Sequence, residues 1–81
     1  MEENVCKEAT YKAVFKEHAR ALRNFLYYKS GNLSVSEDLV QDTFLKLWEN
    51  CSKVTPQKAK SYLFTIANNL FLNSIKHQKV V

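Results

Sequence analysis

The sequence predicts an all-α protein, a three-helix antiparallel bundle. Apolar residues recur every three or four positions along three long segments, and this spacing places side chains on one face of a helix. Two short polar stretches, residues 29–34 and 50–56, separate the segments. With one Gly and one Pro among 81 residues, the chain lacks the turn residues of a many-stranded β fold. A chain of this length makes one domain, and short connections favour antiparallel neighbours.

The first predicted helix runs from about Glu8 to Tyr28. Gly31 is suited to end it, because glycine readily adopts the left-handed conformation found just after a helix. His18 lies within the apolar stripe, where a core histidine is more common than a metal ligand. The opposite face is basic, as on many solvated helices. The apolar stripe comprises Tyr11, Val14, Phe15, His18, Leu22, Phe25 and Leu26, and the basic face comprises Lys12, Lys16, Arg20 and Arg23.

The other two helices carry recognisable start signals. Ser34 and Glu37 have the spacing of a capping box, in which each side chain accepts a hydrogen bond from a free backbone N–H. This predicts a second helix from Ser34 to about Asn50. Thr55 followed by Pro56 predicts the start of a third, because proline lacks only an N–H that the first helical position leaves unpaired. The third helix should extend to about His77.

The second helix has one core face and one unusual outward face. At about 100° per residue, its apolar residues gather on one side and its acids on the other. Leu45 lies among those acids, and an apolar centre with a polar rim resembles a protein interface, although single exposed leucines are also common. The predicted core face is Leu39, Val40, Thr43, Phe44, Leu47 and Cys51. The outward face is Asp38, Gln41, Asp42, Leu45 and Glu49, with Trp48 at the boundary.

The last third of the chain contains no acidic residue. Residues 51–81 hold five lysines and no acid, whereas residues 1–50 hold seven cations and eight acids. The third helix has a wide apolar arc, so we expect it to pack on two sides. Its remaining strip offers amides, hydroxyls, a lysine and an aromatic ring, the groups that bind phosphates and bases. A solvated lysine face is the alternative interpretation. The apolar arc comprises Ala59, Leu63, Phe64, Ile66, Ala67, Leu70, Phe71 and Ile75, and the strip comprises Ser61, Tyr62, Thr65, Asn68, Asn69 and Lys76.

The sequence gives no sign of catalysis. Asp38 and Asp42 are one helical turn apart, but no His lies near them, and there is no nucleophile–base set, glycine-rich phosphate loop or metal-ligand spacing. We therefore expect no enzyme activity, metal or cofactor. Cys6 and Cys51 match no metal or redox spacing and are interpreted as reduced thiols inside a cell. A signal peptide is not expected, because Glu2 and Glu3 replace its basic start, and no apolar run could insert into a membrane. The predicted location is the cytoplasm.

Two motifs resemble a known family. They are Ser36-Glu-Asp-Leu-Val-Gln-Asp-Thr-Phe-Leu-Lys-Leu-Trp48 and Ala59-Lys-Ser-Tyr-Leu-Phe-Thr-Ile-Ala-Asn-Asn69. In order and spacing they are similar to conserved region 2 of the extracytoplasmic-function (ECF) sigma factors of bacterial RNA polymerase. The resemblance covers residues 10–79. It implies a helical bundle of the sigma-factor region 2 type and a role in transcription initiation.

The resemblance also implies partners and site residues. The first motif would bind the coiled coil of the largest subunit of core RNA polymerase. The loop 50–58 and the third helix would bind the non-template strand of the minus-ten promoter element and hold an unstacked base, which melts the promoter. An anti-sigma factor is a further implied partner. The implied polymerase-binding residues are Asp38, Gln41, Asp42, Leu45 and Trp48, and the DNA-binding residues are Lys53, Lys58, Lys60, Tyr62, Asn69 and Lys76.

Such a protein would carry a second domain that reads the minus-thirty-five element. Residues 1–81 contain only the region 2 motifs, so we expect the sequence to be a truncated piece. A function from another class stays open: a helical adaptor whose acidic face binds a protein and whose lysines only keep it in solution. Salt-dependent DNA binding would discriminate the two.

Overall fold

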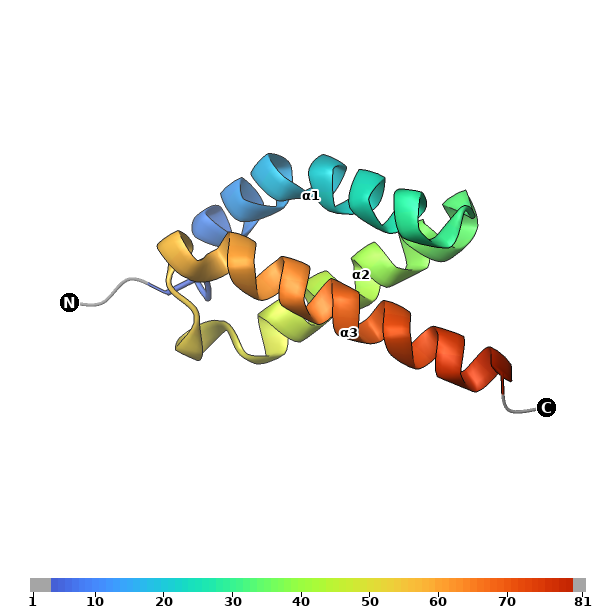
Figure 1. Cartoon of the computed structure of the whole chain (residues 1–81). Helices are drawn as coiled ribbons and strands as arrows, with labels where there is room; N and C mark the ends of the chain where they lie inside the picture. Colours follow the sequence, from blue (N-terminus) through green and yellow to red (C-terminus); the bar gives the residue numbers. More distant parts are fainter. Residues whose placement is uncertain (1–3, 80–81) are drawn as a thin grey trace.

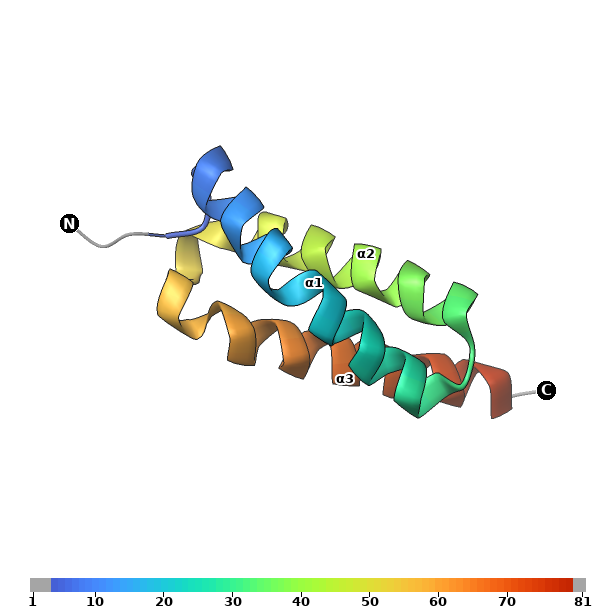
Figure 2. The same cartoon turned by 90° about the horizontal axis from the view of Figure 1, so that it is seen from above.

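The computed structural model describes residues 4–79, with the side chains of residues 4–76, and contains three α-helices. Helix α1 (Glu8–Ser30) is followed by α2 (Leu33–Glu49), two short 3₁₀ turns, η1 (Cys51–Lys53) and η2 (Pro56–Lys58), and α3 (Ala59–Lys79). Consecutive helices run in opposite directions (Figure 1), and α1 crosses obliquely over α2 and α3 (Figure 2). The predicted three-helix antiparallel bundle is confirmed.

The turn between α1 and α2 is built from three local interactions. Gly31 ends α1 with a φ of 68°, and its N–H donates to the carbonyl of Tyr27 at 2.8 Å. The next residue, Asn32, caps α2, because its side-chain oxygen accepts a hydrogen bond from the N–H of Val35 at 3.0 Å. The stop at Gly31 was predicted correctly. The capping box at Ser34 was wrong: Asn32 is an equally good capping residue, and α2 already begins at Leu33.

The start of α3 also differs from the expectation. Pro56 is the first residue of η2, where its missing N–H has no cost. The side chain of Thr55 makes no cap hydrogen bond; instead its carbonyl accepts from the N–H of Lys58 at 3.0 Å. A tight 3₁₀ turn therefore takes the place of the first α-helical turn, and the α-helix begins at Ala59.

The core lies where the three helices meet. Leu22 and Leu26 of α1, Leu47 of α2 and Leu63 of α3 are fully buried. The rings of Phe25 and Phe64 lie 5.1 Å apart and join α1 to α3. The predicted core faces are largely confirmed, with His18 half-buried beside the core. Phe15 is the exception: its side chain is 45% exposed, because it lies at the edge of the α1–α2 contact.

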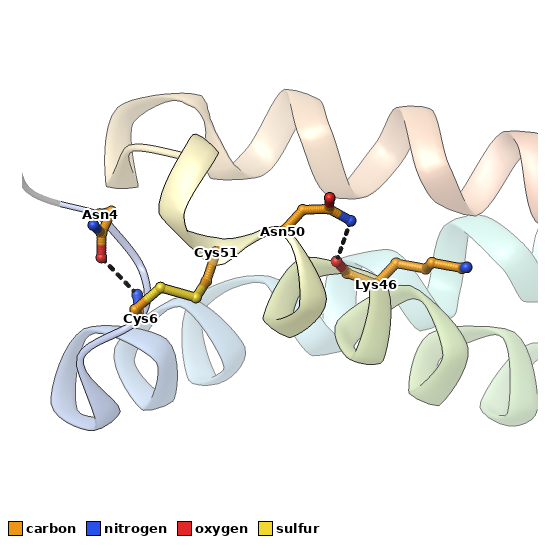
Figure 3. The surroundings of a disulfide bond; sticks show 5 residues. All are labelled: Asn4, Cys6, Lys46, Asn50 and Cys51. Atoms are coloured by element: carbon orange, nitrogen blue, oxygen red, sulfur yellow. Dashed lines mark hydrogen bonds between the residues drawn. A yellow bond between two sulfur atoms is a disulfide. The ribbon is translucent and has the colours of Figure 1, made fainter.

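The prediction of two reduced thiols was wrong. Cys6, before α1, and Cys51, the first residue of η1, form a disulfide with a Cα–Cα distance of 5.0 Å (Figure 3). Their sequence separation of 45 residues matches no motif. The two residues meet only because α1 begins beside the end of α2, which is a tertiary contact that spacing does not reveal.

Candidate functional site

The predicted polymerase-binding residues share one exposed face of α2. Asp38, Gln41 and Asp42 are exposed, and the side chains of Leu45 and Trp48 are 56% and 47% exposed. Among the side chains of residues 4–76, no cation lies within ion-pair distance of either aspartate. Their charges are therefore not neutralised within this part of the chain. This arrangement suits a basic partner with an apolar centre, and the binding role itself stays a prediction.

Tyr11 of α1 supports this face from the side. Its ring lies 5.1 Å from the ring of Trp48 in an edge-to-face arrangement, and its hydroxyl donates a 2.8 Å hydrogen bond to the carbonyl of Phe44. A tyrosine hydroxyl is protonated at neutral pH and can donate, and burial raises the pKa of the Tyr11 phenol further. The hydrogen bond holds Tyr11 against α2, where its ring packs on Trp48. Sequence reasoning assigned Tyr11 to the core and missed this contact.

Two hollows flank the exposed face and extend it onto α1. The first, about 530 Å³, lies between the start of α1 and the end of α2, with Leu45 and Trp48 on its α2 side. The second, about 420 Å³, lies further along the same two helices and includes Phe15 and Gln41. The hollows show that the exposed face of α2 is continuous with residues of α1, which include Arg20 and Arg23 in the second hollow. The first hollow is lined by Glu8, Tyr11, Lys12, Leu45 and Trp48, and the second by Phe15, Ala19, Arg20, Arg23, Glu37, Val40 and Gln41.

The strip on α3 contains three of the predicted DNA-binding residues. Tyr62, Asn69 and Lys76 are seven residues apart, and seven residues are nearly two helical turns, so the three lie along one side of the helix. Asn69 and Lys76 are exposed, and Tyr62 is half-buried. Leu72, 46% exposed, belongs to the same side and was missed. Sequence analysis assigned Leu72 to neither the apolar arc nor the strip, although its spacing of three residues from Asn69 and four from Lys76 places it on their side of the helix.

The remaining predicted lysines lie elsewhere. Lys60 is nine residues before Asn69, which at 100° per residue places it on the opposite side of α3. Lys53 ends η1 and Lys58 ends η2, and all three side chains are exposed. The six predicted DNA-binding residues therefore do not form one patch: three follow one side of α3, and three surround the loop and the first turn of the helix.

Loop 50–58 is fixed by contacts with the N-terminal segment and with the end of α2. Val54 is only 2% exposed, and its carbonyl accepts a hydrogen bond from the N–H of Val5 at 3.2 Å. At the start of the loop, the side-chain amide of Asn50 donates to the carbonyl of Lys46 at 3.1 Å (Figure 3). With the Cys6–Cys51 disulfide, these contacts fix the loop beside the N-terminal segment.

Neither a metal cluster nor a membrane-spanning segment is found in the part of the chain that the structure describes. Within it, no three His, Cys, Asp or Glu side chains come together as metal ligands would. None of its helices has the length and apolar character needed to cross a membrane.

The described residues form a helical bundle with one acidic face, on α2, and one helix without acidic residues, α3. Comparison with known proteins specifies the class. A family model described as "Sigma-70 region 2" matches residues 14–80. The chain belongs to this family, and its curated relatives identify it as a region 2 domain of the ECF type.

The similar proteins are themselves sigma factors. ECF RNA polymerase sigma factor SigL of Mycobacterium tuberculosis is 31% identical over 67 residues, which cover 80% of this chain and 38% of SigL. ECF RNA polymerase sigma factor SigE of Mycolicibacterium smegmatis is 30% identical over 63 residues, which cover 78% of this chain and 24% of SigE. ECF RNA polymerase sigma factor SigM of Bacillus subtilis is 27% identical over 73 residues, which cover 89% of this chain and 45% of SigM. The chain spans less than half the length of each. No solved structure gives a significant match.

Proposed function

We propose that this chain acts in bacterial transcription initiation, binding core RNA polymerase through α2 and capturing the non-template strand of the minus-ten element with loop 50–58 and α3. The observation that carries the proposal is the separation of charge. The acids of α2 surround the exposed Leu45, while the sequence after Asn50 contains none. A protein that binds a basic protein surface and a nucleic-acid strand at the same time needs one acidic surface and one surface without acids.

The α2 side suits a protein partner. Leu45 and Trp48 offer a large apolar area, Tyr11 holds Trp48 in place, and Asp38 and Asp42 supply a negative rim. Aromatic and apolar anchors surrounded by polar residues are typical of the centre of an interface. We propose that the partner is the coiled coil of the largest polymerase subunit. An anti-sigma factor would have to cover one of the two surfaces to silence the chain.

The α3 side suits an open strand. The ring of Tyr62 can stack on a base, Asn69 offers a paired donor and acceptor, and Lys76 attracts phosphate. A base can be read on its Watson–Crick edge only after it leaves the stack, and this costs less in a single strand than in a duplex. The surface should therefore prefer single-stranded DNA. The proposed role binds and positions nucleic acid without chemistry of its own, and it places the chain in the cytoplasm, where polymerase acts.

Polymerase binding is tested with Leu45→Ala. Truncating a central anchor typically costs about 2 kcal/mol, equivalent to about a thirtyfold loss of affinity. Binding of the labelled chain to purified core polymerase is followed by fluorescence anisotropy, with helicity checked by circular dichroism. The matched control is Leu33→Ala, since Leu33 is also on α2 and is 51% exposed. Asp42→Lys, which sets a like charge against a basic partner, is measured in the same way and should also weaken binding. The face does not bind polymerase if Leu45→Ala and Leu33→Ala lose equal affinity, or if neither Leu45→Ala nor Asp42→Lys loses any.

Strand capture is tested with the complex of chain and core polymerase. A single-stranded DNA pool with a randomised centre is enriched on the complex, and the enriched strand is compared with its scrambled version and its duplex. We expect tighter binding of the enriched strand than of either control. If enrichment yields no sequence preference, strand reading fails and the helical adaptor becomes the better interpretation.

A further inference from the structure

The Cys6–Cys51 disulfide joins a segment outside the family match to a loop inside it. The match to the sigma-70 region 2 family begins at residue 14, so Cys6 precedes it and Cys51 lies within it. Figure 3 shows the bond connecting the segment before α1 to the turn after α2. The polypeptide on the Cys51 side is loop 50–58, which the proposed function assigns to the captured base.

Few other contacts hold the N-terminal segment on this loop. Val5 is fully buried, and its N–H donates to the carbonyl of Val54 at 3.2 Å. The N–H of Cys6 is satisfied locally by the side chain of Asn4, at 3.0 Å. Among the described contacts, one backbone hydrogen bond and one buried valine therefore remain to fix the segment when the disulfide is absent.

The disulfide is only partly buried and, for the proposed setting, unexpected. Both cysteines are half-buried residues at the edge of the fold, and their neighbours Lys7 and Ser52 are exposed. The proposed function places the chain beside polymerase in the cytoplasm, where disulfides are rare and, when present, are usually transient and redox-sensing. We propose that Cys6 and Cys51 form a reversible thiol–disulfide switch that sets the affinity of loop 50–58 for the captured strand. This inference rests on the proposed function.

The chemistry balances with two common classes of reagent. For reduction, one thiolate of a dithiol attacks one protein sulfur, breaks the protein S–S bond and releases the other cysteine as a thiolate, which takes up a proton. The second thiol of the dithiol then closes on its own sulfur of the mixed disulfide and releases the attacked cysteine as a thiol. The protein gains two electrons and two protons, and the dithiol becomes a disulfide. For oxidation, one cysteine thiolate reduces hydrogen peroxide to water and becomes a sulfenic acid. The second thiol attacks this sulfur, forms the S–S bond and releases a second water.

The redox state alters the loop more than the helices. With the bond intact, Cys51 is tied to Cys6 and Val54 stays covered by Val5, so the loop keeps one arrangement. After reduction, the segment detaches more readily, Val54 loses its cover and the loop samples further arrangements. Apparent affinity falls with the fraction of chains in the competent arrangement. The oxidised chain therefore binds the strand more tightly. Leu45 lies on an intact α-helix, so polymerase affinity is the same in both states.

The test compares redox states of the full chain bound to core polymerase. The chain is treated with hydrogen peroxide or dithiothreitol before complex formation, and the state is verified by the mass added on alkylation of free thiols. Anisotropy is measured with the enriched strand and its scrambled version. We expect the oxidised chain to bind the enriched strand with an affinity at least about three times that of the reduced chain. The double variant Cys6→Ser/Cys51→Ser should match the reduced chain in both buffers, and Ser34→Ala, which changes an exposed serine outside the loop, should keep the full response.

Two results overturn the switch while leaving the proposed function intact: equal strand affinity in both redox states, or a disulfide that excess dithiothreitol does not open in the folded chain. A chain that binds polymerase but prefers the enriched strand in neither state refutes strand capture, and the switch fails with it. A response to redox state that persists in the double variant assigns the effect to the polymerase instead.

Discussion

Removal of the Cys6–Cys51 crosslink should lower the stability of the domain substantially. The bond closes a loop with a sequence separation of 45 residues. In the chain-entropy treatment, removing such a crosslink raises the conformational entropy of the unfolded chain. This stabilises the unfolded state by about 4 kcal/mol at 25 °C. For a domain of this size, each kcal/mol corresponds to roughly 4–8 °C in Tm. The chain-entropy estimate therefore gives a fall of roughly 15–30 °C.

The expected value lies toward the lower end of this range. In the reduced chain, the native state also gains freedom, because residues 4–6 can detach from Val54 while the three helices stay folded. This freedom favours the reduced native state and offsets part of the entropy released on unfolding. Thermal unfolding is followed by circular dichroism at 222 nm for the oxidised chain, the reduced chain and the double variant Cys6→Ser/Cys51→Ser.

The controls separate the crosslink from other effects of the reagents. The double variant should have the Tm of the reduced wild type and should not respond to dithiothreitol. Ser52→Ala changes an exposed neighbour of Cys51 and should keep the full difference between the oxidised and reduced chains. A difference below about 4 °C, which is the effect of about 1 kcal/mol, would refute the view that the disulfide constrains this domain.

Three further predictions test the helix cap, the support of Trp48 and the Tyr62 side of α3. Asn32→Ala should destabilise the chain by about 1 kcal/mol, measured by urea unfolding, and Ser34→Ala should have a much smaller effect. A larger effect of Ser34→Ala would identify Ser34 as the residue that caps α2. Tyr11→Phe should cost about 1 kcal/mol by loss of the hydroxyl hydrogen bond, measured in the same way, and an unchanged stability would show that this bond contributes nothing. Lys76→Ala should reduce the salt slope of strand binding by about one unit at most, whereas Asn69→Ala should narrow the preference for the enriched strand at constant slope. Lys16→Ala, an exposed lysine of α1 outside both candidate surfaces, is the matched charge control. An equal change of slope in this variant would mean that the strand does not follow the Tyr62 side of α3.

The helices and their faces could be predicted because they depend on local sequence. The exposure of Asp38, Gln41, Asp42 and Leu45 follows from their positions relative to the buried residues of α2, and the fold confirms it. Helix ends were less certain, since several adjacent residues can serve as caps. Asn32 and Ser34 both carry a suitable oxygen, and the structure selects Asn32. A 3₁₀ turn before Ala59 likewise satisfies the same backbone groups as a capped α-helix would.

Contacts between distant segments could not be predicted in this way. The pairing of Cys6 with Cys51 and the packing of Tyr11 on Trp48 depend on how α1 crosses α2, which helical periodicity does not specify. The half-exposure of Phe15 has the same origin, because a wide apolar stripe does not reveal which of its edges a neighbouring helix covers. Leu72, by contrast, was left unassigned although its spacing places it beside Asn69 and Lys76. These residues extend both candidate surfaces beyond the predicted sets.

The polymerase-facing surface and loop 50–58 meet at the end of α2, yet they depend on different supports. Tyr11 belongs to the first turns of α1, where its N–H donates to the carbonyl of Lys7 at 2.8 Å and its hydroxyl bonds to α2. The contact between the rings of Tyr11 and Trp48 therefore depends on the packing of α1 against α2. Loop 50–58 is held by Val54 in the core, by the hydrogen bond from Val5 and by the disulfide, and the last two come from the N-terminal segment. Opening the disulfide should consequently loosen the strand-binding loop and leave the polymerase-facing surface in place, so the two binding activities should separate when the redox state is changed.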